Sequence, residues 1–297
     1  MSAKYLCPIL TSFNDDSTIN YEDMHGLYDH VLSNGIDGIL IGGSAGEFYA
    51  LNYNEAEELI SDAINYINHQ SIVIAGTGRM NRMETINLSN FALEKGADAV
   101  IIVGPYYSAC SQEDVFNYFD DILGHIAGNV YLYNYQDRTG YDISVNTVLR
   151  LLEKHNNLIG IKDTHPVSRH SQKYINEILP KYPSFEVFTG YDTNCVPVVI
   201  SGGAGCIGAL SNVYPKLCHD LVSSLNKGDY NKIVEIERKI DKYALFYEAY
   251  TPFNPLMKWA LNEMGYSIQE NCRVPISKLT SDVKADLDAV ANRLWRE

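Results

Sequence analysis

A lysine that directly follows a short aliphatic run is the first residue in this sequence that could do chemistry. Residues 158–161 read Leu-Ile-Gly-Ile, and the next side chain is Lys162. The simplest interpretation is that a buried strand surfaces at this point, with the lysine stem along the core and its ammonium in water. A partly desolvated lysine, in contrast, has a nucleophilic amine that can attack a ketone. The resulting Schiff base withdraws electrons from the adjacent carbon, so that a carbon–carbon bond can be made or broken there.

Residues with hydroxyl groups, and groups that could bind an anion, also stand at or near the ends of apolar runs. Ser44 lies in the glycine-rich segment 42–46, and Tyr107 and Tyr133 end two further runs. With 22 tyrosines in the chain a single one says little, but three hydroxyls near a lysine could relay a proton. The backbone N–H groups of segment 42–46 suit a carboxylate or phosphate, although a plain tight turn explains its glycines at least as well. Arg138 could bind a substrate carboxylate in a bidentate fork or form a surface ion pair.

Motifs for metals and nucleotide cofactors are absent or misplaced. Residues 203–208 match the dinucleotide fingerprint G-x-G-x-x-G, but they lead into a predicted strand and do not follow one into a helix. The eight histidines lack metal-ligand spacing, and the six cysteines are scattered without a C-x-x-C pair. We therefore expect reduced thiols, no metal and no cofactor other than a covalent Schiff base.

Short apolar runs alternate with amphipathic helical patterns along most of the chain. The predicted strands are 6–13, 38–43, 71–78, 99–104, 129–134, 158–162, 185–190 and 206–210. In 54–67, for example, apolar residues recur on one face at helical spacing. Alternating strands and helices pair the strands in parallel, and near-continuously apolar strands fit a sheet covered on both faces. Eight such units favour a (β/α)8 TIM barrel over an open doubly wound sheet, and a barrel gathers all the strand ends at one mouth.

More chain follows the eighth strand than a barrel needs. Residues 231–250 and 253–265 have helical patterns, and no Ser/Gly linker precedes them. We predict a barrel over 1–225, with the active site at the C-terminal strand ends. We predict a helical extension over 226–297 that packs on the barrel or on a partner subunit.

Composition limits the partners of this chain. Hydrophobic residues make up 46% and charged residues 20% of the 297 residues, as in ordinary globular proteins. A formal net charge of −14 argues against nonspecific binding to nucleic acid or to an anionic membrane, since both need a basic face. The N-terminus lacks the pattern of a signal peptide, and no apolar run reaches membrane-spanning length. We expect a cytoplasmic protein that acts on small molecules.

Four short motifs at the predicted strand ends resemble the dihydrodipicolinate synthase / N-acetylneuraminate lyase family. They are G-[ST]-x-G-E at 43–47, P-Y-Y at 105–107, Y-N…T-G at 133–140 and G-I-K-[DE] at 160–163. The resemblance runs from the first strand through the C-terminal helices. It implies a homotetrameric, pyruvate-handling class I aldolase that works on a keto acid and an aldehyde.

The resemblance also implies roles for individual residues. Lys162 would form the Schiff base, Tyr133 would act as general acid and base, and Ser44 and Tyr107 would complete a proton relay. In this family the tyrosine that matches Tyr107 reaches the site of the neighbouring subunit. The further residues expected to bind substrate are Ala45, Arg138, Thr164, Gly190, Asp192, Thr193 and Ile207. Ala45 lacks a hydroxyl that commonly binds the pyruvate carboxylate in this family, which leaves backbone N–H groups for the task, while Ile207 would line the pyruvate pocket.

Fewer residues indicate which branch of the family the chain resembles. Segments 43–48, 160–164, 190–192 and 251–253 resemble the 2-keto-3-deoxy-sugar-acid aldolases, which is the branch we favour. Arg138 resembles dihydrodipicolinate synthase, which condenses pyruvate with aspartate semialdehyde, although 135–137 replaces the usual proline-containing loop. N-acetylneuraminate lyase usually has Glu where Thr193 stands and Ser where Ala209 stands. A barrel that only binds a keto acid, without turnover, is the remaining alternative.

Overall fold

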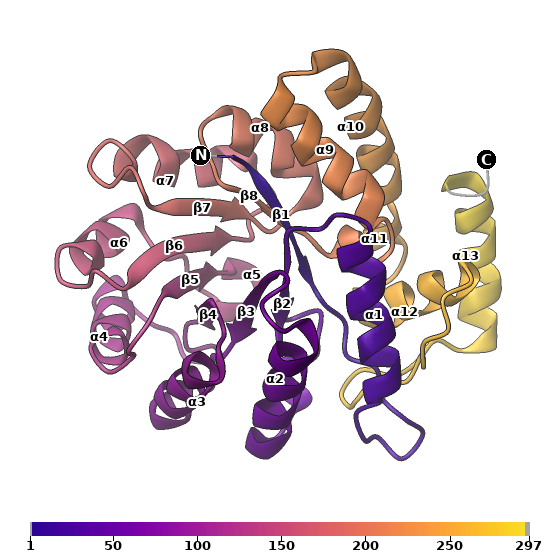
Figure 1. Cartoon of the computed structure of the whole chain (residues 1–297), viewed down its shortest axis with the longest axis horizontal. Helices are drawn as coiled ribbons and strands as arrows, with labels where there is room; N and C mark the ends of the chain where they lie inside the picture. The colour runs from indigo at the N-terminus through magenta and orange to yellow at the C-terminus, as the bar shows by residue number, and fades with distance from the viewer. Residues whose placement is uncertain (1, 295–297) are drawn as a thin grey trace.

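The chain folds as a closed barrel of eight parallel strands (Figure 1). The structure is a computed structural model that describes residues 2–294. Consecutive strands are hydrogen-bonded neighbours, and the last strand closes the barrel against the first. The strands are β1 (Lys4–Pro8), β2 (Gly38–Ile41), β3 (Ile72–Gly76), β4 (Ala99–Val103), β5 (Val130–Asn134), β6 (Leu158–Asp163), β7 (Glu186–Thr189) and β8 (Gly205–Ile207). The predicted (β/α)8 barrel is confirmed, and the alternative of an open doubly wound sheet is wrong.

Helices follow the strands and cover the outside of the barrel (Figure 1). They are α1 (Tyr21–Ser33), α2 (Tyr53–Ile67), α3 (Arg82–Lys95), α4 (Gln112–Leu123), α5 (Gln136–Thr139), α6 (Val145–Leu152), α7 (Ser168–Ile178), α8 (Cys195–Ile200) and α9 (Pro215–Lys227), with short 3-10 helices η1 (Phe48–Ala50), η2 (Asp192–Asn194) and η3 (Ala209–Asn212). Local sequence sets where several begin. Asn52 and Glu55 form a capping box at the start of α2, in which each side chain satisfies a backbone N–H of the other.

The first strand is shorter than its apolar run predicts. The run 6–13 suggests one long strand, whereas β1 spans Lys4–Pro8. Ile9, Leu10 and Phe13 continue beyond the barrel and are fully buried. Phe13 is covered by the C-terminal segment, because the charged groups of Lys258 and Arg273 lie 4.9 Å and 4.5 Å from its ring centroid. The residues within 9–13 that are apolar are therefore so because they are buried, with Phe13 under the extension, and not because they pair as a strand.

Side chains on alternate strand positions fill the barrel interior. Leu6, Leu40, Ile74, Ile101 and Phe188 belong to one cluster that Tyr131 and Tyr133 also join. A second, larger cluster lies between the strands and the surrounding helices. The interior is therefore a packed core.

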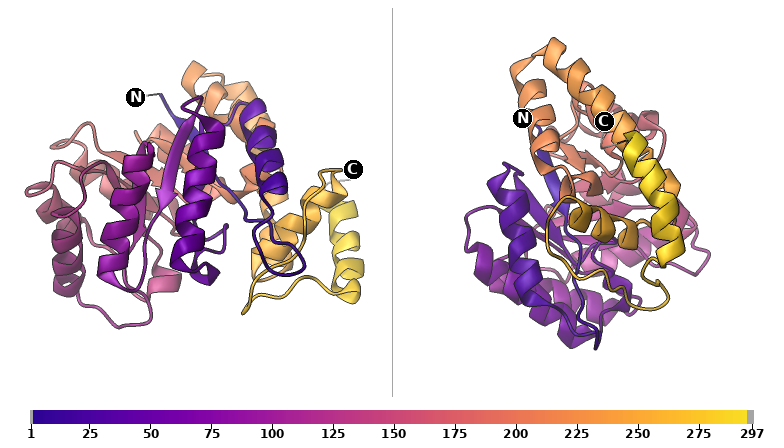
Figure 2. Two further views of the ribbon diagram at one scale, coloured as in Figure 1. Left: turned by 60° about the horizontal axis from the view of Figure 1, so that its bottom comes forward. Right: turned by 90° about the vertical axis from the view of Figure 1, so that its right-hand side faces the viewer.

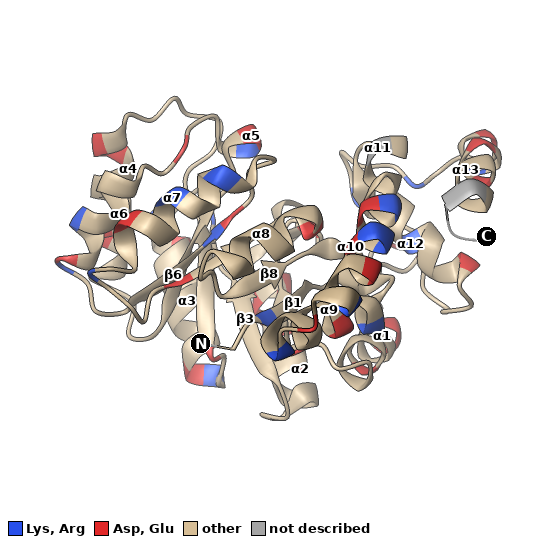
Figure 3. Ribbon diagram, turned by 90° about the horizontal axis from the view of Figure 1, so that it is seen from above, with Lys and Arg blue, Asp and Glu red and all other residues tan. Residues whose placement is uncertain are grey.

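The C-terminal extension consists of α10 (Tyr230–Ala244), α11 (Phe246–Ala249), α12 (Phe253–Glu263) and α13 (Ser281–Leu294). The helical pattern over 231–250 is split at Leu245 into α10 and α11, and within α11 the Tyr247 hydroxyl donates to Asp192 Oδ2 at 3.1 Å. The exposed face of α10 carries both signs of charge, with Lys232 and Lys239 each 2.9 Å from Glu235 (Figure 3).

The segment between α12 and α13 runs past α1 (Figures 1 and 2). The backbone N–H of Gln269 donates to Asp23 at 2.8 Å, and the rings of His30 and Tyr266 are 3.9 Å apart. All six cysteines are free. Within residues 2–294, every helix is too short or too polar to cross a membrane.

Candidate active site

A cavity of about 560 Å³ opens at the C-terminal ends of the strands. Most of the residues expected to catalyse the reaction or to bind substrate line it, namely Ser44, Ala45, Tyr133, Lys162, Thr164, Gly190, Asp192, Thr193 and Ile207. Residues from the C-terminal extension, among them Asp241, Leu245, Tyr247 and Phe253, form the opposite wall. The cavity is thus bounded by strand ends on one side and by α10 to α12 on the other.

Lys162 and Tyr133 are cross-strand neighbours at the base of this cavity. The pairing of β5 with β6 places Tyr133 opposite Lys162, so both side chains lie on the same face of the sheet. Lys162 is only 4% exposed, and its Nζ lies 4.3 Å from the centroid of the Tyr133 ring. The Tyr133 hydroxyl is 3.5 Å from Ser44 Oγ. An amine and two hydroxyls therefore converge on one point of the cavity wall.

The environment of Lys162 differs from that of the other buried lysine among the described residues. Lys258 is fully buried, and its Nζ lies 2.7 Å from Glu47 Oε1 and 2.7 Å from the carbonyl oxygen of Asn271. The ion pairs formed within residues 2–294 include none at Lys162, whose amine faces an aromatic ring and open space. A buried amine without a carboxylate is free to react, whereas Lys258 is a structural group.

The turn over residues 42–47, which we call the Ser44 turn, presents backbone N–H groups to the cavity. The N–H groups of Gly46 and Glu47 donate within the turn, to the carbonyls of Gly43 (3.0 Å) and Ser44 (3.3 Å). Within residues 2–294, the N–H groups of Ser44 and Ala45 have no protein acceptor. Both residues line the cavity, so these donors can bind an anionic ligand there.

The extension holds the Ser44 turn in place. The side-chain amide of Asn254, on α12, donates to the carbonyls of Ser44 (3.1 Å) and Ala45 (2.9 Å). Glu47 has a left-handed backbone, with φ of 55°, and its fully buried carboxylate accepts from Lys258 and from the N–H of Arg273 (2.9 Å). These contacts fix the turn to segments more than 200 residues later in the chain.

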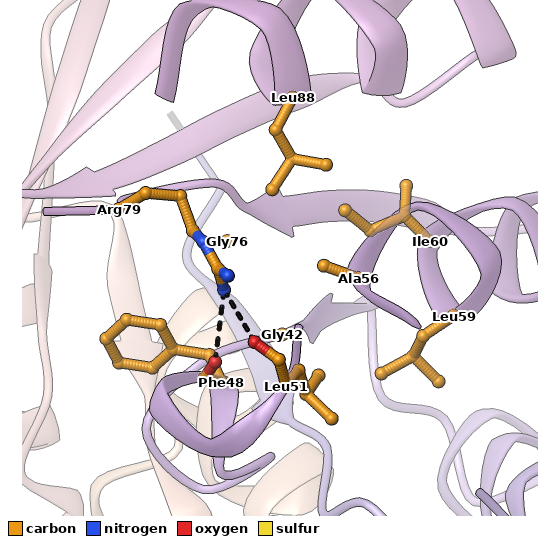
Figure 4. Close-up of a pocket in the computed structure, with 9 residues that line it drawn as sticks. All are labelled: Gly42, Phe48, Leu51, Ala56, Leu59, Ile60, Gly76, Arg79 and Leu88. Carbon is orange, nitrogen blue, oxygen red and sulfur yellow. Dashed lines mark hydrogen bonds between the residues drawn. The ribbon is translucent and has the colours of Figure 1, made fainter. Parts of the chain in front are cut away.

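Arg79 supports the same region from the other side. After β3, its Nη1 donates to the carbonyls of Leu51 (3.0 Å) and Phe48 (3.4 Å) around η1 (Figure 4). Apolar side chains of α2 and α3, including Leu59 and Leu88, surround this small pocket (Figure 4). The guanidinium thus ties the segment after β3 to both ends of η1, adding to the bond that the Phe48 carbonyl already accepts from the Leu51 N–H (3.2 Å).

Gly190 and Thr164 shape the wall beside Lys162. A Cβ atom on Gly190 would lie 1.9 Å from Thr164 Oγ1 and 3.1 Å from Lys162 Cε, so no larger residue fits there. Thr164 Oγ1 is buried and has no hydrogen-bond partner among the described residues. An unpaired buried hydroxyl costs free energy, which a ligand hydroxyl or carboxylate in the cavity would recover.

The carboxylate of Asp192, which we expected to bind substrate, already accepts hydrogen bonds on both oxygens. Its Oδ1 accepts from the Tyr5 hydroxyl and from the N–H of Leu210 (3.2 Å), and its Oδ2 accepts from Tyr247. Burial raises the pKa of this carboxyl above its ordinary value, while the hydrogen bonds from Tyr5 and Tyr247 oppose the shift. Both oxygens already have donors, so in this chain Asp192 ties α11 to the barrel.

Arg138 and Tyr107 do not line the cavity. Arg138 lies exposed on α5, with its guanidinium carbon 5.4 Å from the ring centroid of Tyr135, a residue that lines the cavity and stacks on Tyr133. Tyr107 is 100% exposed and has a left-handed backbone, with φ of 74°. The geometry of a single chain therefore assigns neither residue a contact with ligand.

The sequence patterns missed several residues of the site. Tyr135 and Tyr191 adjoin predicted residues and could have been included as neighbours of strand ends. Asp241, Tyr247 and Asn254 lie in ordinary helical patterns with no signal of a role. Within residues 2–294, no group of histidine, cysteine and acidic side chains has the arrangement of a metal site.

Comparison with known proteins finds relatives over the barrel and the extension. Residues 1–294 match the model of the dihydrodipicolinate synthetase family. The chain is 30% identical over 287 residues to the putative 2-dehydro-3-deoxy-D-gluconate aldolase YagE of Escherichia coli K12, covering 97% of this chain and 95% of YagE. It is 35% identical over 285 residues to the 4-hydroxy-tetrahydrodipicolinate synthase of Polynucleobacter asymbioticus, covering 95% of this chain and 91% of that protein. The crystal structure of YagE in complex with pyruvate matches with a TM-score of 0.94 at 30% identity, over 98% of both chains.

The barrel, its site and these relatives together define a class I, pyruvate-dependent aldolase. Within that class, the chain belongs to the dihydrodipicolinate synthetase family. Relatives of about 30% identity carry the names of enzymes with different substrates, since some are named as sugar-acid aldolases and others as 4-hydroxy-tetrahydrodipicolinate synthases.

Proposed function

We propose that the protein makes or breaks a carbon–carbon bond between pyruvate and an aldehyde through an imine at Lys162. The observation that carries this proposal is the buried, unpaired amine of Lys162, which lies against Tyr133 and faces the cavity. The amine adds to C2 of pyruvate, and loss of water gives the imine. Loss of a proton from C3 gives an enamine, whose C3 attacks the aldehyde carbonyl. Cleavage follows the same steps in reverse.

Tyr133 is the acid and base in this proposal. Its ring contacts the lysine amine and its hydroxyl lies 3.5 Å from Ser44 Oγ, so a proton can pass between the imine and the hydroxyls. The free N–H groups of Ser44 and Ala45 bind the pyruvate carboxylate, since Ala45 offers no hydroxyl. Tyr107 completes the relay in the site of a neighbouring subunit of a homotetramer, a role supported by its full exposure in the single chain.

We predict that Tyr133→Phe slows carbon–carbon chemistry about a hundredfold or more, the usual scale for loss of a positioned acid and base. The substitution removes only the hydroxyl, so that pyruvate still binds at Lys162. Steady-state kcat on the preferred substrate measures the effect, and Tyr135→Phe, which removes a hydroxyl from the neighbouring ring, is the matched control. An unchanged kcat in Tyr133→Phe would show that another group moves the proton.

A 2-keto-3-deoxy sugar acid is the proposed substrate. Thr164, with its unpaired buried hydroxyl, and Thr193 line the cavity and can bond to substrate hydroxyls. A buried polar group left unpaired by the wrong substrate costs about 1–3 kcal/mol, so this lining favours hydroxylated aldehydes. The name of YagE supports the same branch. Arg138 and the synthase of Polynucleobacter asymbioticus support the second candidate, condensation of pyruvate with aspartate semialdehyde.

The two candidates are separated by measuring kcat/KM for cleavage of 2-keto-3-deoxygluconate and for condensation of pyruvate with aspartate semialdehyde. We expect the sugar acid to be preferred by at least about tenfold, the scale of one lost buried hydrogen bond. Thr164→Val should reduce that preference, because it removes the hydroxyl and keeps the volume. A preference for the semialdehyde in the wild-type protein would reject the sugar-acid assignment and leave the imine mechanism intact.

A further inference from the structure

The residues that follow Tyr133 and Lys162 point away from the cavity. Asn134 ends β5 and Asp163 ends β6, and the two are opposite each other in the strand pairing. Because side chains alternate along a strand, they lie on the outer face of the sheet when Tyr133 and Lys162 lie on the inner face. Asp163 is fully buried there.

Four side chains on this outer face form a closed ring of hydrogen bonds. Asn134 Nδ2 donates to Asp163 Oδ1 (2.9 Å) and to Asp142 Oδ1 (2.6 Å). His170, on α7, completes the ring, with Nδ1 at 3.0 Å from Asp163 Oδ2 and Nε2 at 2.9 Å from Asp142 Oδ2. The ring joins the ends of two strands to the loop before α6 and to the helix that follows β6.

The ring requires a charged histidine. Carboxylates only accept hydrogen bonds, so each of the two ring nitrogens of His170 must carry a proton. The hydrogen bonds to Asp142 and then to Asp163 raise the pKa of His170 to about 9, so the imidazolium persists at neutral pH. His165 stacks on the imidazole with ring centroids 4.3 Å apart, and Tyr174 contacts it edge-on at 5.5 Å.

The strand pairing and the outer ring act on the same strand ends. The β5–β6 ladder shifts register between Val130 and Tyr131 and then pairs continuously through Tyr133–Lys162 and Asn134–Asp163, where the ring begins. Ser171 Oγ also donates to Asp163 (2.6 Å), but within residues 2–294 only His170 places a positive charge between the two carboxylates. Without that charge, Asp142 and Asp163 would face each other with like charge, which disfavours the ring that ties the strand ends together.

We propose that His170 is a positioning residue for the reaction, because its bridge between Asp163 and Asp142 fixes the ends of β5 and β6 so that the Tyr133 hydroxyl meets the imine at Lys162. The inference rests on the proposed roles of Lys162 and Tyr133. His170 itself lies behind the strands, outside the cavity lining, and contacts neither substrate nor the reacting atoms.

The test uses pyruvate alone, so the aldehyde need not be known. In D2O, reversible formation of the enamine exchanges the C3 protons of pyruvate for deuterium, and NMR follows the exchange. In His170→Phe we expect kcat for exchange to fall about tenfold or more while KM for pyruvate changes less than about threefold, since a misplaced acid and base lowers rate more than binding. His165→Phe, which alters the adjacent stacked histidine outside the ring, should exchange at the wild-type rate.

His170→Gln provides a second variant that keeps a hydrogen-bond donor and adds no bulk, in case the phenylalanine prevents folding. A fall in kcat with retained KM in either folded variant supports the inference. A lower melting temperature with wild-type kcat per folded molecule would mean a purely structural role and would overturn it. Borohydride labelling tests the proposed imine separately from the role of His170. If pyruvate and borohydride fail to label Lys162 in the wild-type protein, the imine mechanism itself is overturned.

Discussion

Lys162→Ala is expected to abolish both covalent trapping and turnover. Wild-type protein incubated with pyruvate and borohydride should gain the mass of a reduced pyruvate adduct on the peptide that contains Lys162. The variant should gain none, because no other described lysine lines the cavity and the other buried lysine, Lys258, is held by Glu47. Loss of the nucleophile removes the covalent route entirely, so residual activity should fall to the background rate.

Lys239→Ala is the chemical control for this experiment, since it removes an exposed amine on α10 that lies outside the cavity lining. This variant should still be labelled on Lys162. Normal turnover by Lys162→Ala, or a labelled peptide elsewhere in the wild-type protein, would refute the assignment. Tight binding of pyruvate without any labelling would instead favour a protein that binds keto acids and does not turn them over.

Breaking the buried ion pair between Lys258 and Glu47 is expected to have the largest effect on stability. Both side chains are fully buried, so Lys258→Met leaves the Glu47 carboxylate in the interior with the Arg273 N–H as the one remaining donor of the hydrogen bonds seen within residues 2–294. Removing one partner of a buried pair typically costs about 3–5 kcal/mol. Urea unfolding should show a loss of this size in the free energy of unfolding, because the uncompensated charge cannot reach water.

Two comparisons make that measurement specific. The double variant Glu47→Leu, Lys258→Met removes both charges and should recover much of the lost stability, since apolar replacements of buried pairs are often neutral. Lys239→Met breaks an exposed pair with Glu235 on α10 and should leave unfolding unchanged within error. Equal losses in the single and double variants would mean that packing, not charge, makes the contribution.

Strand ends were the part of the site that the sequence could predict. Apolar runs mark the strands, and a parallel barrel brings the residue after each run to one mouth. The sequence alone therefore placed Ser44, Tyr133, Lys162 and Gly190 together, and all four line the cavity. Their proposed roles remain predictions. The fold followed from the same alternation, although Ile9 and Leu10 lengthened the first predicted strand because they are buried beyond its end.

Contacts between distant segments could not be predicted. Asn254 and Lys258 are ordinary polar positions in a helical pattern, and only the packing of α12 against the barrel brings them to the Ser44 turn. Asp192 shows the reverse case, because its position at a strand end suggests a substrate ligand whereas Tyr5, Leu210 and Tyr247 occupy its oxygens. Periodicity reports which face of an element is buried and carries no information on which distant residue will cover it.

The anchoring of the Ser44 turn orders events during biosynthesis. A nascent chain exposes Lys162 and Tyr133 long before the ribosome has made Asn254, Lys258 and Arg273, the residues that hold the turn. Until then Glu47 has no cation to pair with, and the donors of Ser44 and Ala45 are not fixed in the cavity. The order of translation therefore delays formation of this turn until residues 254–273 have emerged, so a barrel terminated before them would carry Lys162, the proposed nucleophile, without a formed Ser44 turn.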